Sequence, residues 1–100
     1  MIYITQLIFV KKGKENEFLE FENHVIPLME KYNGKVLYRI RPSAENYVDL
    51  IEKMPFEIHF ISFNSENELG QFMKDDDRLN FIHLKDESVE SILLVKGEEI

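Results

Sequence analysis

Residues 55–63 read PFEIHFISF, and the fold of the chain depends on this stretch. Successive side chains of an extended chain point to opposite faces, so Phe56, Ile58 and Phe60 share one face. The other face carries Glu57, His59, Ile61 and Phe63. Because both faces are largely apolar, the sequence predicts a strand that other parts of the protein must cover on two sides.

Three more strands are predicted around this one. Residues 2–10 are almost continuously apolar and rich in β-branched side chains, and residues 35–41 alternate as in a strand with two different faces. Residues 89–96 predict a fourth strand with an apolar centre. Residues 42–54 show no clear period, so we expect a connection there that either wraps a sheet edge or lines a pocket.

A helix is predicted over residues 14–32. Its apolar side chains recur every three or four residues and form one stripe that faces the core. The stripe contains Phe18, Phe21, Val25, Leu28, Met29 and Tyr32. Pro27 interrupts this pattern, so the helix either bends there or ends near Ile26 and restarts. Asn33 and Gly34 then predict a left-handed end.

A second helical region is predicted after residue 64. Ser65 and Glu68 have the order of a capping box, in which the serine caps the helix and the glutamate bonds back to it. An aspartate of the run 75–77 can cap a further short helix. His83 lies on one side of that helix.

The resulting order is strand, helix, strand, strand, helix, strand in a single domain over residues 1–100. This order predicts an α+β, ferredoxin-like fold, in which a four-stranded antiparallel sheet carries its helices on one face. The other face exposes Tyr3, Leu7 and Phe9, an apolar area larger than a monomer usually leaves in water. We therefore expect a homodimer in which two such faces pack together.

The composition excludes several classes of function. The chain has 100 residues, a net charge of −7 and no cysteine. A negative field repels polyanions, so we expect no nucleic-acid partner. Without cysteine, thiolate catalysis and cysteine-ligated metals are excluded. No stretch approaches the roughly 20 apolar residues of a membrane span, and no signal-peptide pattern opens the chain, so we expect a cytoplasmic protein without a membrane partner.

Nearly the whole chain resembles the dimeric α/β-barrel superfamily. The resemblance is carried by the opening strand with KKGKENEFLEFENHVIPLMEKYNGKVLYRIRP, and by the later segment PFEIHFISFNSENELGQFMKDDDRLNFIHLKD. This superfamily includes antibiotic-biosynthesis monooxygenases, heme-degrading monooxygenases and small bacterial families without an assigned function. The chain is most similar to the last group. The resemblance implies a dimeric α/β barrel.

Heme-degrading members of the superfamily use an Asn on the first strand, a Trp on the second helix and a His further along. The corresponding positions here hold Gln6, Phe72 and His83, so only the histidine matches. The two departures predict that this chain does not degrade heme, and we expect it to use no cofactor.

Two histidines are candidates for catalysis. His83 is either a base or metal ligand, since its pKa lies near neutrality, or a helix histidine bonded to a neighbour. No second ligand stands at the spacing of a helical pair, so we expect no metal site. If the helices cover Phe56 and Ile58, His59 faces the dimer interior, as a structural polar contact or as a catalytic group.

Four further residues are candidates for ligand binding. Gln6 is the lone polar side chain on an aliphatic strand face, so its amide either bonds the backbone or lines a cavity. Tyr38 and Arg39 could orient an anionic or phenolic ligand, although strand arginines also form surface ion pairs. Phe72 takes the place of the Trp that the resemblance indicates.

These observations leave three hypotheses about function. The first is a homodimer of unassigned role that holds a small apolar or aromatic ligand between sheet and helices. The second, implied by the resemblance, is a cofactor-independent monooxygenase or isomerase acting on a small aromatic or polyketide-like compound. The third is a ligand-sensing module without catalysis. Convergence of Gln6, Phe72 and His83 on one cavity would favour catalysis or sensing.

Overall fold

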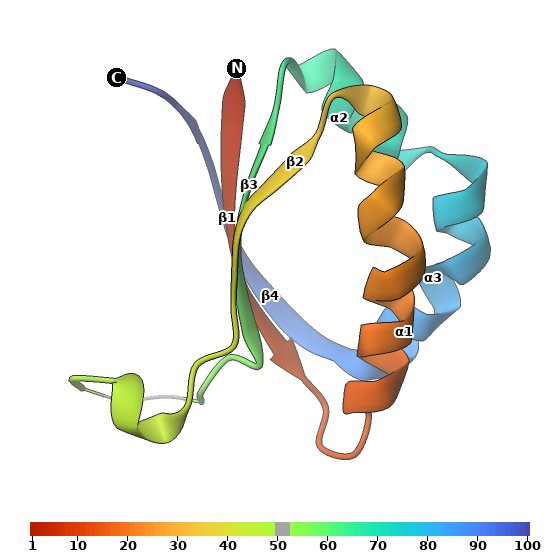
Figure 1. Cartoon of the computed structure of the whole chain (residues 1–100). Helices are drawn as coiled ribbons and strands as arrows, with labels where there is room; N and C mark the ends of the chain where they lie inside the picture. Colours follow the sequence, from red (N-terminus) through yellow and green to blue (C-terminus); the bar gives the residue numbers. More distant parts are fainter. Residues whose placement is uncertain (50–52) are drawn as a thin grey trace.

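The computed structural model describes residues 1–49 and 53–100. The elements are β1 (Ile2–Val10), α1 (Glu15–Val25), η1 (Ile26–Tyr32), β2 (Lys35–Ile40), η2 (Ala44–Asn46), β3 (Glu57–Phe63), α2 (Glu66–Met73), α3 (Asp76–Ser88) and β4 (Val89–Glu98). The strands form one antiparallel sheet in the order β2-β3-β1-β4. The main helices lie on one side of this sheet (Figure 1). The predicted α+β, ferredoxin-like fold is confirmed.

The first helical segment is divided at Pro27. An α-helix ends at Val25, and a 3-10 helix follows over Ile26–Tyr32 with Pro27 in its first turn. Proline has no N–H to donate, so it fits the first turn of a new helix better than a helix interior. Of the two predicted alternatives, an end near Ile26 with a restart is the one observed.

Asn33 and Gly34 join η1 to β2 for different reasons. Asn33 ends η1 in the left-handed conformation, with φ 57°. Gly34 is needed for space, because a Cβ at this position would lie 2.5 Å from the ring of Phe63. Phe63 is fully buried, so its ring has no room to move aside. This close approach holds η1 against β3.

Helices α2 and α3 begin at the predicted caps. Ser65 Oγ accepts a hydrogen bond from the Glu68 N–H at 3.2 Å, and Asp75 Oδ1 accepts one from the Arg78 N–H at 3.0 Å. Asp75 also accepts a hydrogen bond from Tyr32 Oη, which ties the start of α3 to η1. Helix α3 has 13 residues and is longer than the short helix predicted. None of the helices that the structure describes is long and apolar enough to cross a membrane.

The hydrophobic core lies between the sheet and the helices. Its buried members are Ile2, Ile4, Phe21, Val25, Met29, Ile61, Phe63, Phe72 and Leu84. Residues directly opposite each other in neighbouring strands share a face of the sheet. In the β1–β3 pair, Ile4 lies opposite Ile61 and Gln6 lies opposite His59. The core therefore occupies the same face as Gln6 and His59.

The condition under which His59 would face a dimer interior is not met, because the helices do not cover Ile58. In the structure His59 and Glu57 are buried, and His59 contacts Glu22 of α1, whereas Ile58 lies opposite Leu7 on the far side of the sheet. The physical reason is register: the pairing of Ile61 with the core strand β1 carries Glu57 and His59 to the helix side.

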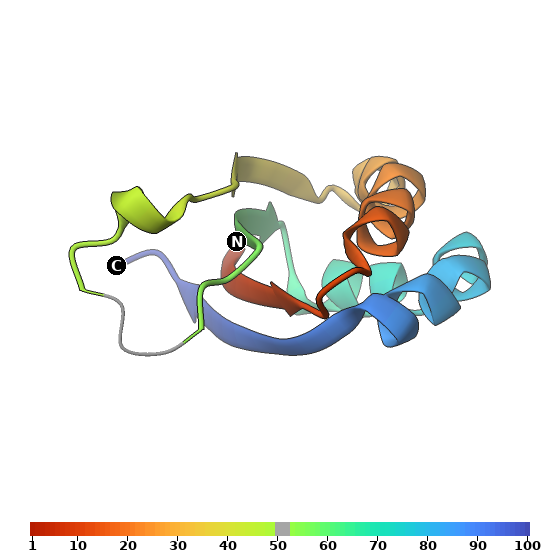
Figure 2. The same ribbon diagram turned by 90° about the horizontal axis from the view of Figure 1, so that it is seen from below.

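The far side of the sheet carries an apolar surface, which we name the open face. It contains Tyr3, Leu7, Tyr38, Ile40, Ile58, Phe60, Leu93 and Val95. The exposed fraction is 65% for Tyr38, 57% for Leu93 and 61% for Val95. The connection that holds η2 reaches away from the helices in both views (Figures 1 and 2). The described residues of the chain thus leave this face in contact with water.

Candidate functional site

Five charged side chains gather between α1, β2 and β3, and we name them the Glu–His–Arg network. His59 Nε2 lies 2.8 Å from Glu57 Oε1 and 2.9 Å from Glu22 Oε2. Arg39 reaches both carboxylates, with Nη2 2.7 Å from Glu22 Oε1 and Nε 3.0 Å from Glu57 Oε1. Arg41 donates a hydrogen bond to Glu57 Oε2. Each carboxylate therefore has more than one cationic partner.

The local sequence places each member of this network. Glu22 falls on the apolar stripe of α1, four residues after Phe18 and three before Val25, so it faces the sheet. Glu57 and His59 alternate on the same face of β3. Arg39 lies opposite His59 in the β2–β3 pair. One helix stripe and one strand register thus bring the charges together.

Burial and ion pairing act in opposite directions on the pKa values. Burial lowers the pKa of His59, but hydrogen bonds to Glu22 and Glu57 outweigh it and raise this pKa to about 9. Burial raises the pKa of Glu57, but hydrogen bonds from His59 and the arginines hold it well below its usual range. Burial dominates at Glu22, whose pKa is raised. His59 is therefore protonated at neutral pH.

Three members of the network also have a spacing that a metal ion could use. Ligand atoms of Glu22, Glu57 and His59 lie within 4.8 Å of one another. A metal would require a neutral imidazole and free carboxylate oxygens. Here the imidazole is protonated, and Arg39 and Arg41 already bond the carboxylates. The arrangement fits an ion-pair network better than a metal centre.

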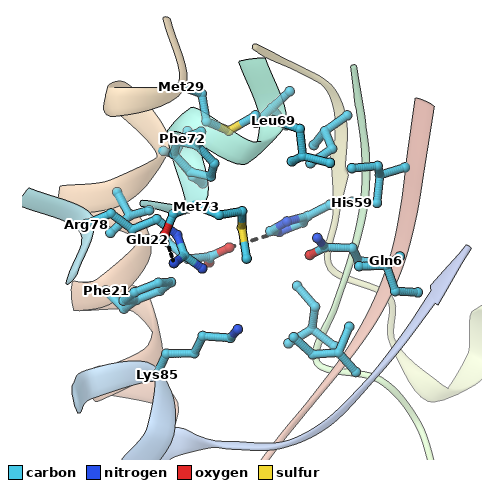
Figure 3. A pocket seen from close by; sticks show the side chains of 18 of the residues that line it. Gln6, Phe21, Glu22, Met29, His59, Leu69, Phe72, Met73, Arg78 and Lys85 are labelled. Carbon is cyan, nitrogen blue, oxygen red and sulfur yellow. Dashed lines mark hydrogen bonds and ion pairs between the residues drawn. The ribbon is translucent and has the colours of Figure 1, made fainter. Parts of the chain in front are cut away.

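A cavity of about 290 Å³ lies between the sheet and the helices, beside the network (Figure 3). Its wall is mostly apolar, with Ile4 and Ile61 from the sheet and Phe21 and Phe72 from the helices. The polar side chains that line it are Gln6, Glu22, His59, Arg78, Lys85 and Lys96. Small-molecule sites commonly have such a composition, with a few polar groups converging on an apolar space.

Three of the predicted site residues meet at this cavity. Gln6, His59 and Phe72 all line it. In Figure 3 the amide of Gln6 extends into the cavity beside His59. Of the two alternatives for Gln6, lining a cavity is therefore the one observed.

The other three predicted site residues lie elsewhere. Arg39 belongs to the network but does not line the cavity. Tyr38 lies on the open face, where its ring is 6.2 Å from that of Phe60. His83 is exposed on α3, away from the cavity wall. Convergence of Gln6, Phe72 and His83 therefore occurs for the first two residues only.

Sequence reasoning missed four polar residues of the cavity wall: Glu22, Arg78, Lys85 and Lys96. A signal existed for Glu22, because a charge on the apolar stripe of a helix indicates a buried partner. Arg78 and Lys85 are two helical turns apart and share a side of α3. Their spacing is equally typical of a solvent-exposed face, so it did not indicate a site.

We expect the protein to lose stability as the pH rises from about 6.5 to about 9. The folded state raises the pKa of His59 from 6.5 to about 9, so folding favours the protonated imidazole. This contribution is complete below the unfolded pKa of about 6.5 and is lost as the pH passes through the folded value. The free energy of unfolding should fall by about 3 kcal/mol.

Urea unfolding at about pH 6.5 and about pH 9.5 measures this loss. In His59→Gln most of the difference should disappear, because the titrating group is absent. His83→Gln serves as the control, since His83 is exposed, and it should keep the wild-type difference. An equal loss in wild type and His59→Gln would contradict the assignment to His59.

Comparison with known proteins gives similarity in structure but not in sequence. No protein-family model matches the chain, and a search of curated proteins finds no significant match. A protein of unknown function from Rhodopseudomonas palustris superposes with a TM-score of 0.83 at 11% identity, over 99% of this chain and 82% of that chain. An uncharacterized NIPSNAP domain protein from Burkholderia xenovorans gives 0.70 at 10% identity, over 100% and 95%.

A protein from Nitrosomonas europaea, proposed to be an antibiotic biosynthesis monooxygenase, gives a TM-score of 0.73 at 10% identity, over 100% of this chain and 99% of that chain. At such identities the likeness concerns the fold alone. The resemblance predicted from the sequence is confirmed at this level. The chain has a ferredoxin-like fold, and it shares this fold with the NIPSNAP domain protein and with the protein from Nitrosomonas europaea.

Proposed function

We propose that this protein binds a small, largely apolar molecule in the cavity between sheet and helices, and that it does so as a homodimer. The observation that carries the proposal is the cavity of about 290 Å³, which approaches the usual size range of small-molecule sites. Its apolar wall favours a hydrophobic ligand. Gln6 and His59 supply polar groups that can orient one.

The open face supports the homodimer. Apolar surfaces of this extent favour association, and twofold pairing of two such faces covers both at once. Tyr3 stacks on Phe60 with ring centroids 5.5 Å apart, so aromatic surface is available on this face for a second sheet to pack against.

Neutral aromatic probes test the binding site. We expect 2-naphthol to bind the purified protein saturably with a micromolar Kd in isothermal titration calorimetry, because its rings replace water against the apolar wall. Leu94→Trp enlarges a side chain of the cavity wall and should weaken binding about tenfold or more.

Leu79→Trp is the matched control for this variant. Leu79 is 46% exposed on α3 and does not line the cavity, so its replacement should leave the affinity unchanged. Decan-1-ol, a neutral alcohol with a flexible aliphatic chain, serves as a second probe of the apolar cavity. If neither 2-naphthol nor decan-1-ol binds saturably, the proposed function is wrong.

A cofactor-independent monooxygenase or isomerase is the second candidate function. This candidate is favoured by Glu22 and His59, which contact each other and are buried at the cavity wall. The pKa of each side chain is raised, and groups that transfer protons in enzymes often have shifted pKa values. The fold shared with a proposed monooxygenase is compatible with this candidate. Oxygen uptake with a panel of hydroquinones, lost in His59→Gln and kept in His83→Gln, would distinguish such an enzyme from a binding protein.

A further inference from the structure

Two cations of α3, Arg78 and Lys85, line the cavity without an anionic partner among residues 1–49 and 53–100. Arg78 is 6% exposed, and its Nη1 donates to the Met73 carbonyl at 3.2 Å. Its Nε is buried and has no hydrogen-bond partner within the described residues. Figure 3 shows the Lys85 side chain extending into the cavity. Both residues therefore line the same space, and the guanidinium of Arg78 keeps a donor without a partner among the described residues.

The other charges of the cavity wall are already paired. Lys96 Nζ lies 2.8 Å from Glu66 Oε1, and Glu22 bonds Arg39 and His59. Glu22 therefore does not supply the missing anion for α3. The positive charge that remains at the cavity comes from Arg78 and Lys85.

Holding two cations together away from water has a cost. Burial lowers the pKa of Arg78, and burial together with the charge of Arg78 lowers the pKa of Lys85. The chain has 19 acidic residues and a net charge of −7, yet in the described structure none of its carboxylates forms an ion pair with either cation. Asp86 attracts both only through space. An anion from outside the chain would remove this cost.

We propose that the ligand of this cavity is a carboxylate with an apolar body, and that its carboxylate pairs with Arg78 and Lys85. This inference rests on the proposed function and specifies its ligand class. The free Nε of Arg78 lies on a planar guanidinium that matches the geometry of a carboxylate, and Lys85 adds a second, mobile charge. The apolar body packs against Phe21 and Phe72. A single negative charge suits a space whose wall is otherwise mostly apolar.

A matched pair of probes tests this assignment. 2-Naphthoate and 2-naphthamide have nearly the same shape and differ in charge. In isothermal titration calorimetry at neutral pH, wild type should bind the naphthoate about tenfold or more tighter than the naphthamide. Lys85→Met keeps the length of the side chain and removes its charge, so it should weaken naphthoate binding about tenfold and leave naphthamide binding unchanged.

Two further variants complete the test. Lys74→Met removes a charge from an exposed lysine outside the cavity and should change neither affinity. Arg78→Lys keeps the charge and removes the planar guanidinium, so it should reduce the preference for the naphthoate in part.

Each outcome bears on a different proposal. Equal affinities of wild type for the two probes would overturn the carboxylate assignment and leave the small-molecule site in place. Failure of both probes to bind would overturn the proposed function. If circular dichroism shows that Lys85→Met is unfolded, the carboxylate assignment is tested by the preference of wild type for the naphthoate and by the reduction of this preference in Arg78→Lys.

Discussion

Glu57→Gln should lower the free energy of unfolding by about 3 kcal/mol or more. Glu57 is 1% exposed and bonds His59, Arg39 and Arg41. A neutral glutamine does not balance these cations, and its NH₂ group would point a donor at one of them. Because the two arginines are partly exposed, water can replace some of the lost interaction, which keeps the loss near the lower end of the range for buried pairs.

Urea unfolding followed by circular dichroism measures this loss, and Glu66→Gln is the matched control. Glu66 is 61% exposed and pairs with Lys96 at 2.8 Å, so the same substitution there removes a surface ion pair. Such pairs contribute about 1 kcal/mol or less. A loss at Glu57 no larger than at Glu66 would show that the network does not stabilise the fold.

Leu93→Glu should convert the proposed dimer into a monomer. Leu93 is 57% exposed and lies opposite Leu7 in the β1–β4 pair, on the open face. A glutamate there would be buried without a partner when two open faces pack together, and twofold symmetry places two such charges in one interface. We expect the dissociation constant of the dimer to rise about 100-fold or more.

Sedimentation velocity at micromolar concentration measures this change. Leu79→Glu is the matched control, because Leu79 is 46% exposed on α3, which lies on the helix side of the sheet. This variant should sediment as a dimer, as wild type should. A wild-type protein that sediments as a monomer at these concentrations would refute the proposed dimer.

The element order was predictable because it depends on local patterns. Alternation and apolar runs indicated the strands, and a capping box indicated the start of α2 at Ser65. Pro27 indicated the break between α1 and η1. The candidate site was predictable in part for the same reason: Gln6 and His59 are polar residues within apolar strands, and both line the cavity.

His83 and Tyr38 show the limit of this reasoning. Both were chosen for the chemistry of the side chain or for a resemblance in sequence, and both lie away from the cavity. The direction in which a side chain of α3 or β2 points depends on how that element packs against the rest of the chain. The local sequence pattern does not predict this direction for an amphipathic residue such as His83 or Tyr38.

The sequence was sufficient for the ferredoxin-like order of elements and for a sheet that is apolar on both faces, since both follow from periodicity within single segments. The sequence did not determine which face of β3 packs against the helices or that Glu22 forms an ion pair with His59. It also did not indicate that Arg78 and Lys85 line the cavity. These features depend on strand register and on helix packing. Both are set by contacts between segments far apart in the chain, whose energies no local pattern contains.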